Sequence, residues 1–307
     1  MSDSGPRSAP ATPPPTALFE RGRRFVRRRF ALRTNAAIRI GGGIAGLLVL
    51  AALVGPTASP YDPTAQALEA RLQGPSFAHP LGTDALGRDV ATRLAYGARV
   101  SLALAVAATT VRLVIGTTVG LLAATGGRLV DTVLMRLVDI QLAFPALVLA
   151  LVVAGVLGPS VRNVVIALSL VGWASYARVV RGSVLAVRER PFVRSAKLYG
   201  TPWHRLVRRH LLPHVASPVL VLATLNVGTV VLAAAGLSYL GLGAQPPTPE
   251  WGTMIADGRN YLRSAPWIVT APGVAIMLTV VSFNLLGDGL RDALDSEHFD
   301  DRSRRRI

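Results

Sequence analysis

The chain contains no cysteine and only one lysine among its 307 residues, and each scarcity excludes a kind of chemistry. Without cysteine the chain cannot form a disulfide, a thiolate metal site or a cysteine nucleophile. The single lysine, Lys197, lies between Ala196 and Leu198, whereas a Walker A nucleotide loop needs Gly-Lys followed by Ser or Thr. Any ATP chemistry therefore has to belong to another chain, and we expect this one to bind no cofactor.

Charged and aromatic residues are also scarce. Only 16% of the residues are charged, against about 25% in a typical soluble domain, while 51% are hydrophobic and the mean hydropathy is +0.43. The net charge of +16 comes from arginines that cluster between long apolar runs. Aromatic residues make up only 6% of the chain, so stacking platforms for bases are lacking and we expect no nucleic-acid partner.

Six apolar runs are long enough to cross a bilayer core of about 30 Å at a rise of about 1.5 Å per residue. They predict an all-α integral membrane protein with six transmembrane helices. A long basic region precedes the first run, which favours an uncleaved anchor over a signal peptide. The predicted spans are 38–54, 100–125, 137–157, 161–180, 215–242 and 268–290.

The arginine clusters predict the orientation, because loops rich in Lys and Arg stay on the cytoplasmic side. The N-terminal region, the predicted turn at 126–136, the stretch 181–214 and the end after residue 290 all fall on one side of the six spans. Both termini are therefore predicted to be cytoplasmic. The expected domains are a disordered basic tail at 1–36, a six-helix transmembrane domain at 37–295 and a basic tail at 296–307.

The cytoplasmic loop at about 187–214 has the pattern of two short amphipathic helices joined at a glycine. Pro191 fits the first turn of one helix, Gly200 its left-handed end, and Pro213 the end of the second helix. Such an element fits either the bilayer surface or a groove on a soluble partner, and the residues leave both open. The predicted apolar positions are Phe192, Ala196 and Tyr199, then Trp203, Leu206, Val207, His210 and Leu211. The predicted basic positions are Arg194, Lys197, Arg205, Arg208 and Arg209.

The same loop resembles the EAA loop of ABC importer permeases. That pattern is Glu-Ala-Ala, three residues, Gly, nine residues, then a short apolar stretch that ends in Leu-Pro. Arg194 and Ser195 stand where the family has Glu and the first Ala. The resemblance implies a coupling helix that sits in a cleft of an ATPase subunit. The candidate coupling residues are Arg194, Ser195, Ala196, Lys197, Tyr199, Gly200, Trp203, Arg205, His210, Leu212 and Pro213.

Further motifs resemble the C-type subunit of oligopeptide and dipeptide permeases, and together they cover residues 36 to 295. They are HPLGTD with GRD at 79–89, VGW with YAR at 171–178, LSYLGLG at 237–243, QPP with WG at 245–252, and NLLGD with LRD at 284–292. Ala234 stands where the family often has Glu. The resemblance implies the type I (MetI-like) ABC importer permease fold, in a bacterial cytoplasmic membrane.

The resemblance also implies partners. These are a second, B-type permease subunit with six spans, two cytoplasmic ATPase subunits that hold ATP and Mg²⁺, and an external binding protein that delivers di- or oligopeptides. Two loops on the external side either dock this binding protein or simply pack over the mouth of the bundle. The candidate docking residues are His79, Asp84, Arg88, Gln245 and Trp251.

Polar residues inside the spans are candidates for the translocation pathway, because a charge in lipid costs at least a few kcal/mol. Arg112 either forms a salt bridge inside the bundle or contacts the pathway. Asp139 is expected to cap a helix or pair with Arg136, and Asp288 to pair with Arg291 at a helix end. The candidate pathway residues are Arg112, Asp139, Gln141 and Asn226.

Several alternatives stay open or are disfavoured. The same machinery serves nickel, glutathione or other small solutes, and the permease sequence does not separate these cargoes. An ion-coupled secondary transporter predicts paired acidic residues at mid-membrane and an inverted repeat, which the sequence lacks. An intramembrane enzyme would need HExxH, Gly-x-Ser-x-Gly or a carboxylate pair within a span. His204, His210 and His214 lack acidic neighbours at ligand spacing, so no metal site is expected.

Overall fold

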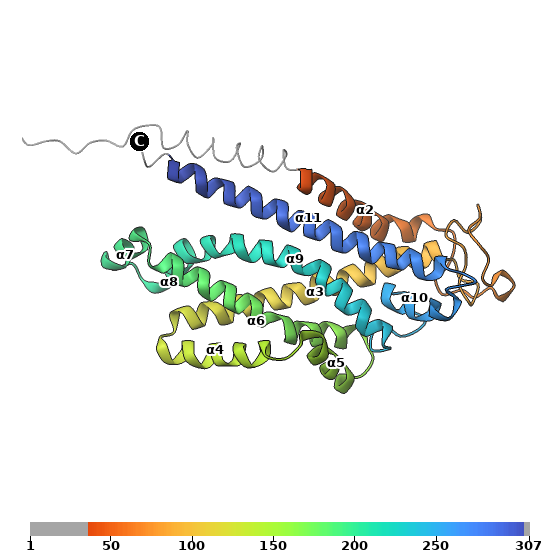
Figure 1. Cartoon of the computed structure of the whole chain (residues 1–307), viewed down its shortest axis with the longest axis horizontal. Helices are drawn as coiled ribbons and strands as arrows, with labels where there is room; N and C mark the ends of the chain where they lie inside the picture. The colour runs from red at the N-terminus through yellow and green to blue at the C-terminus, as the bar shows by residue number, and fades with distance from the viewer. Residues whose placement is uncertain (1–35, 304–307) are drawn as a thin grey trace, which may run out of the picture.

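A computed structural model describes residues 36–303, and its regular elements are helices apart from an isolated bridge between Thr83 and Asp89. The long helices run roughly along the longest axis of the molecule (Figure 1). The elements are α2 (Ala36–Ala58), η1 (Leu68–Ala70), α3 (Val90–Thr125), α4 (Arg128–Leu142), α5 (Ala146–Leu157), α6 (Val161–Arg188), α7 (Pro191–Leu198), α8 (Trp203–Leu206), η2 (Val207–Leu211), α9 (Leu212–Tyr239), α10 (Trp251–Gly258), η3 (Arg259–Tyr261) and α11 (Trp267–Ser303).

Five helices in the described range are long and apolar enough to cross a membrane, namely α2, α3, α6, α9 and α11. Helices α4 and α5 together pass the same test but are bent by 90°. The prediction of one continuous span at 137–157 is therefore wrong. Pro145 is the N-cap of α5, where its ring and missing N–H disfavour a continuous helix and favour a break between α4 and α5.

Other predicted boundaries also shift. Helix α4 begins at Arg128, so only residues 126 and 127 of the predicted turn at 126–136 lie outside a helix. Helix α3 begins at Val90, well before residue 100, because the Asp89 side chain accepts a 2.7 Å hydrogen bond from the backbone N–H of Thr92 and caps the helix. Helix α11 continues to Ser303, so Asp288 lies inside it and not at its end. The predicted N-terminal tail lies outside the described residues except for its last position.

Helices α3 and α6 approach so closely that their backbones almost touch. A Cβ atom on Gly116 would lie 2.3 Å from the Cβ of Tyr176, and one on Gly120 would lie 2.5 Å from the carbonyl oxygen of Ala177. Small residues at helix contacts permit this approach in lipid, where van der Waals packing and not the hydrophobic effect drives association. The α3–α6 pair forms the centre of the bundle, with α9 packed against both.

The buried guanidinium of Arg112 on α3 depends on a third glycine at this contact. Its Nε donates a 2.7 Å hydrogen bond to the carbonyl oxygen of Leu168 on α6. A Cβ atom on Gly172 would lie 2.1 Å from that Nε. The missing side chain thus opens a helix carbonyl to Arg112. Among the described residues the partner of Arg112 is this carbonyl oxygen and not a carboxylate, which differs from the salt bridge that was one of the two expectations for it.

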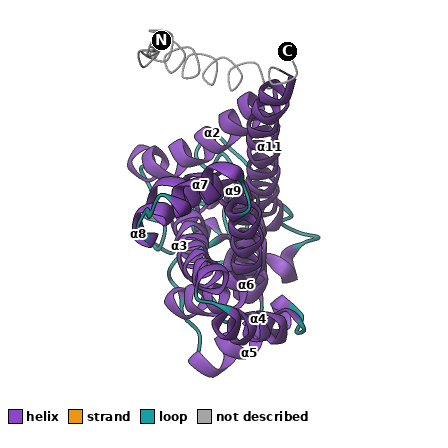
Figure 2. Ribbon diagram, turned by 90° about the vertical axis from the view of Figure 1, so that its left-hand side faces the viewer, coloured by secondary structure: helices purple, strands orange, loops and turns teal. Residues whose placement is uncertain are grey.

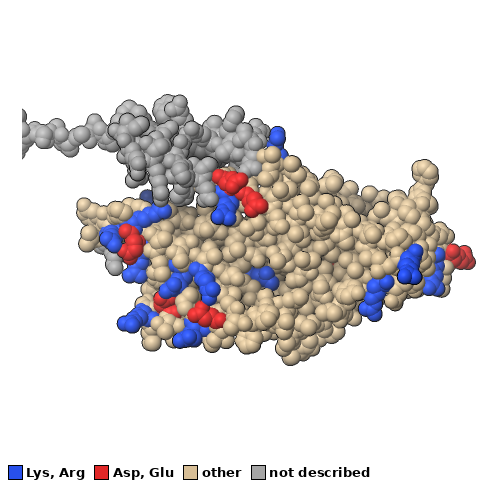
Figure 3. Space-filling view, in the orientation of Figure 1, with Lys and Arg blue, Asp and Glu red and all other residues tan. Residues whose placement is uncertain are grey.

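The remaining helices flank this centre, as the end-on view shows (Figure 2). Helices α2 and α11 pack together on one side, and α4 and α5 lie on the other. At one end of the long axis lies the elbow, which we define as α7, the Gly200 turn, α8 and η2. At the opposite end lies the cap, which we define as residues 59–89 and 240–266 (Figure 1). On the face shown, charged side chains gather toward these two ends, and largely uncharged surface fills the broad region between them (Figure 3).

The α3–α6 contact predicts that Gly172→Ala lowers the free energy of unfolding by about 1–3 kcal/mol, because the new methyl group collides with Arg112. Gly182→Ala in the same helix is the matched control: no atom would lie within 4 Å of its Cβ, so the change should be neutral or slightly stabilising. The measurement is denaturant unfolding in micelles. In an Arg112→Ala background the cost of Gly172→Ala should largely disappear. An equal cost in both backgrounds would contradict this packing.

Candidate functional site

The elbow begins and turns where the sequence predicts. Pro191 is the first residue of α7, and Gly200 adopts φ +70° after its last turn. The Thr201 N–H donates a 3.1 Å hydrogen bond to the carbonyl oxygen of Ala196, which closes a Schellman-type end. A side chain at position 200 would be strained in this left-handed conformation. The glycine therefore reverses the chain between α7 and α8.

The elbow is anchored to the bundle by three apolar side chains. Val193, Leu206 and Leu211 are 2%, 2% and 0% exposed, in one apolar cluster with valines of α6 and α9 that include Val184 and Val215. These contacts make the elbow and the adjoining ends of α6 and α9 one packed unit.

The predicted apolar face of α7 is wrong in detail. Phe192 is 40% exposed and stacks on the ring of His214 at 5.5 Å between centroids, while Tyr199 is 90% exposed. Leu198, beside it, is 87% exposed. Val193 takes the buried position because the helix is rotated relative to the predicted stripe. The elbow thus presents an exposed apolar tip, which we define as Leu198 and Tyr199.

Most of the other predicted coupling residues lie on the surface around this tip. The Arg194 side chain pairs with Glu189 of the same chain; both are more than 60% exposed, so the pair contributes little stability. Pro213 does not end the second helix: η2 continues directly into α9, where Pro213 is in the first turn and its missing N–H is tolerated. Ser195, Arg205 and Leu212 are exposed and Ala196 is partly buried. The side chains of Lys197, Trp203 and His210 lie outside the described part of the chain.

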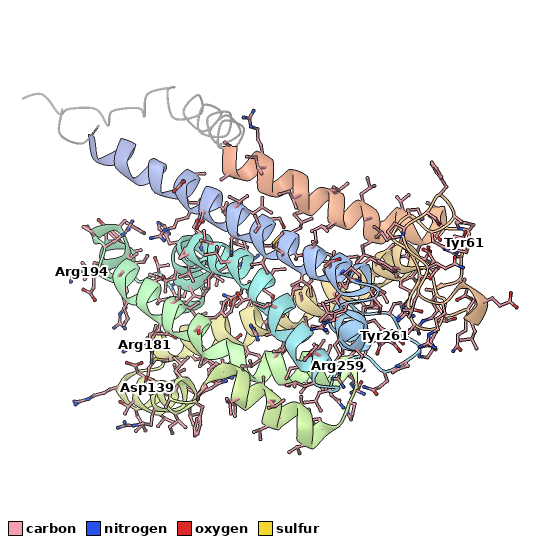
Figure 4. All side chains as sticks on the ribbon, turned by 45° about the vertical axis from the view of Figure 1, so that its right-hand side comes forward. Tyr61, Asp139, Arg181, Arg194, Arg259 and Tyr261 are labelled. Atoms are coloured by element: carbon pink, nitrogen blue, oxygen red, sulfur yellow. The ribbon has the colours of Figure 1, made fainter. Side chains whose placement is uncertain are left out.

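Two ion pairs join α4 to α6 on the flank of the bundle (Figure 4). Asp139 accepts a 2.7 Å hydrogen bond from Arg178, so its predicted pairing with Arg136 is wrong. Asp131 and Arg181 form a two-bond contact of 2.5 and 2.6 Å, which sequence reasoning missed. Both residues fall in predicted cytoplasmic loops, Asp131 at 126–136 and Arg181 at 181–214, so no helical register that would bring them together is predicted.

The two amide candidates have different surroundings. The Gln141 side chain is partly buried and donates to the carbonyl oxygen of Leu170 on α6. The Asn226 side chain donates a 2.8 Å hydrogen bond to the carbonyl oxygen of Leu222 in its own helix, α9. Of the four predicted pathway residues, the structure brings Asp139 and Gln141 together on α4, buries Arg112 and leaves Asn226 partly buried on α9.

The cap is built on a buried ionic network. Asp84 accepts a 2.6 Å hydrogen bond from Arg88 Nε and lies 3.5 Å from Arg93 Nε, and these three side chains are at most 8% exposed. His79 lies 3.0 Å from the carboxylate of Asp89. Buried charges need such partners, because removal of one leaves the others uncompensated. The network fixes the loop before α3.

The predicted docking residues divide by exposure. Trp251 is 1% exposed and donates its indole N–H to the carbonyl oxygen of Leu94 at 3.1 Å. With Asp84 and Arg88, Trp251 belongs to the interior of the cap. Gln245 is exposed and His79 partly exposed, so these two candidates reach the surface. The burial of Asp84, Arg88 and Trp251 fits the alternative expectation, in which these loops pack over the mouth of the bundle.

A cleft of about 460 Å³ opens in the cap between the end of α9 and α10. Its wall includes the charged residues Arg93, Asp257 and Arg259, of which the sequence predicted none as functional. A second, water-sized cavity of about 20 Å³ lies between the Asp84–Arg88 pair and Arg93 and Asp257. Asp257 lies 3.8 Å from Arg88 and its side chain is 50% exposed. Figure 4 shows Arg259 beside Tyr261 at this end of the molecule.

The arrangement of these parts defines a class of protein. A bundle of apolar helices with an anchored elbow at one end and a charged cap at the other is a multi-pass membrane protein. Residues 116–297 match the family described as binding-protein-dependent transport system inner membrane component, and residues 22–75 match the N-terminal transmembrane domain of oligopeptide transport permease C. The chain belongs to this family of ABC transporter permease subunits, which are inner membrane proteins.

Relatives cover most of the chain. It is 44% identical over 288 residues to a dipeptide transport system permease protein of Alkalihalophilus pseudofirmus, with 93% of this chain and 94% of the relative covered. It is 42% identical to a glutathione transport system permease protein of Pectobacterium atrosepticum, with 87% and 89% covered. It is also 42% identical to a probable D,D-dipeptide transport system permease protein of Escherichia coli, with 81% and 84% covered.

The surroundings of Asp257 predict a pH dependence. Desolvation raises the pKa of Asp257 above its ordinary value of 3.8, against the opposing effect of Arg88 and Arg93 and with a small further rise from Asp84. An acid with a raised pKa binds its proton more tightly in the folded state, so stability falls as pH rises from about 4 through the raised pKa. Asp257→Asn removes this dependence and should be at least as stable as the wild type at neutral pH.

The measurement is the Tm of the protein in nanodiscs from about pH 4 to pH 7. The exposed Asp62, whose pKa is lowered mainly by the hydroxyl of Thr64, supplies the opposite control. Asp62→Asn should lower stability slightly at neutral pH. A marked loss of Tm at pH 7 in Asp257→Asn would show that the carboxylate is favoured in the fold and would contradict the assignment.

Proposed function

We propose that this permease subunit imports di- and oligopeptides in a complex with two cytoplasmic ATPase subunits, a B-type permease subunit and an external binding protein. In this complex the elbow faces the cytoplasm and the cap faces outward. ATP and Mg²⁺ are bound by the ATPase subunits, and this chain contributes no catalytic residue. The proposal gives the chain six spans, with the bent α4–α5 pair counted as one, and places both termini in the cytoplasm.

The observation that carries the proposal is the exposed tip on an anchored elbow. Leu198 and Tyr199 are nearly fully exposed, while Val193, Leu206 and Leu211 fix the same element to α6 and α9. An apolar tip fits a groove in a soluble partner, and the rigid anchor carries a push at the tip into the spans. Arg194, paired within the chain, leaves the apolar contact to dominate the docking.

If the elbow lay on the bilayer surface, its apolar side chains would have different contacts. An element held on lipid buries its apolar side chains in the headgroup region, and its basic residues lie along the bilayer plane. Here the buried side chains are already covered by α6 and α9. The tip projects from the end of the bundle, which supports docking to a protein over a place on the bilayer (Figure 1).

The surface formed by α4 and α6 is proposed to face either the translocation pathway or the second permease subunit. The side chains of Asp139 and Arg178 are 56% and 57% exposed although both lie in helices of the apolar bundle. A charge pair facing lipid is costly, so this flank faces water or the second permease subunit. Asp139 and Gln141 are therefore the pathway residues that we propose, whereas Arg112 and Asn226 support the bundle from inside.

Peptide cargo rests on the relatives, and glutathione is the second candidate. The permeases of A. pseudofirmus and E. coli are named for dipeptide transport, and that of P. atrosepticum for glutathione transport at nearly the same identity. Competition uptake with dialanine and with glutathione in cells that express the whole transporter separates the two cargoes. His79 and Gln245, on the surface of the cap, are the proposed contacts of the binding protein.

Polar substitutions at the tip are predicted to impair coupling to the ATPase without impairing folding. The double variant Leu198→Ser with Tyr199→Ser should insert normally but reduce ATPase binding and substrate-stimulated ATP hydrolysis at least about tenfold, because most of the energy of a docking contact comes from a few buried apolar anchors. The measurement is ATP hydrolysis by the assembled transporter in nanodiscs. Phe77→Ser, an equally exposed apolar residue on the cap, is the control. Normal stimulation in the double variant would exclude the coupling role.

A further inference from the structure

The cleft in the cap has the size and the lining of a small-molecule site. Its volume of about 460 Å³ falls in the range of about 300–1,000 Å³ that is typical of ligand pockets. Polar and charged side chains are prominent in its wall, in contrast to the apolar flanks of the bundle. The lining includes Arg93, Asp257, Arg259, Gln245, Thr248 and Ser238.

Both signs of charge are fixed in this wall. Arg93 is held by the carbonyl oxygen of Pro63 at 2.9 Å and by Asp84 at 3.5 Å, so its guanidinium is pre-positioned. Asp257 is half exposed and borders both the cleft and the water-sized cavity behind it. Arg259, two residues further on and exposed, adds a second cation. A ligand in the cleft therefore meets donors for a carboxylate and an acceptor for an ammonium group.

The cost of these charges also points to a ligand. Desolvation raises the pKa of Asp257 although Arg88 lies 3.8 Å away, so the fold holds this carboxylate against part of its own desolvation. A charged side chain kept in a cleft against its own desolvation is typical of functional sites. The hydroxyl of Ser238, buried in the wall, has no hydrogen-bond partner among the described residues.

We propose that this cleft binds a small zwitterion, with the carboxylate of the ligand on the arginines and its ammonium group on Asp257. Short peptides, whatever their side chains, share these two groups, as does glutathione. The proposal rests on the proposed function, which places the cap on the side where the binding protein releases its cargo. The cleft then receives the solute before it enters the bundle.

A docking surface for the binding protein is the rival occupant of this region. Stable protein contacts cover roughly 1,200–2,000 Å² with a broad surface. A concave cleft of ligand size with both signs of charge fits a small solute better. The experiment must nevertheless measure docking and solute binding separately.

The probe is the dipeptide L-Ala-L-Ala, titrated by saturation-transfer NMR against the assembled transporter in nanodiscs without binding protein. We expect saturable binding, at least about fivefold weaker for the C-terminal amide and for the N-acetylated peptide. In Arg259→Gln the wild-type preference for the free carboxylate should largely disappear. In Asp257→Asn the preference for the free ammonium group should largely disappear. Arg263→Gln, an exposed arginine of the cap outside the cleft, is the control and should bind as the wild type does.

Docking of the binding protein to the same variants is measured by light-scattering or surface-plasmon titration, and should be unchanged. Absence of saturable dipeptide binding, or equal binding by all variants, would overturn the proposal. Weaker docking with unchanged dipeptide binding would also overturn it, since the cleft would then be a protein contact. If cells import dipeptides normally but no dipeptide binds the cleft, this inference fails alone. If dipeptides bind but are not imported, the proposed cargo fails.

Discussion

The absence of water in a bilayer core is the constraint on which the rest of this structure depends. Backbone groups must be satisfied within helices, and a side-chain charge must lie at an end, find a partner or face an aqueous space. The chain obeys this with apolar helices whose charges gather at the elbow and the cap. Arg112 can lie in the interior because Gly172, which has no side chain, lets its Nε reach and hydrogen-bond the carbonyl oxygen of Leu168. The functional regions are therefore the places where polar groups are tolerated.

The close α3–α6 contact gives these two regions a mechanical connection. The glycines at this contact bring the two backbones together, and α6 leads directly into the elbow, whose apolar anchors also hold α9. Helix α9 ends at the cleft of the cap. A displacement at the elbow tip thus has a continuous packed route, through α6 and α9, to the opposite end of the bundle. Spatial continuity of this kind permits coupling, and only a measured response to nucleotide establishes it.

The sequence predicts the helical class and most of the apolar runs, because length and hydropathy decide whether a segment can span lipid. The family is predicted separately, from the resemblance of the motifs at 79–89, 237–243 and 284–292 to those of peptide permeases. The sequence also predicts the Gly200 turn, because a left-handed residue after a short helix is a local property. The bend before Pro145 escaped prediction, since apolar composition continues through it. The Asp139–Arg178 and Asp131–Arg181 pairs and the cleft around Asp257 escaped it because they depend on the register of helices far apart in the chain.

The central claim, that a separate ATPase grips the elbow tip, has a direct test because the chain has no cysteine. With Tyr199→Cys as the sole cysteine in this subunit, a short bifunctional reagent should cross-link the subunit to an ATPase subunit in native membranes. The yield should change when ATP is trapped in the complex. Phe77→Cys at the cap should give no such product. Cross-links to the ATPase from position 77 and none from position 199, or modification of the thiol at position 199 only by lipid-soluble reagents, would contradict the account.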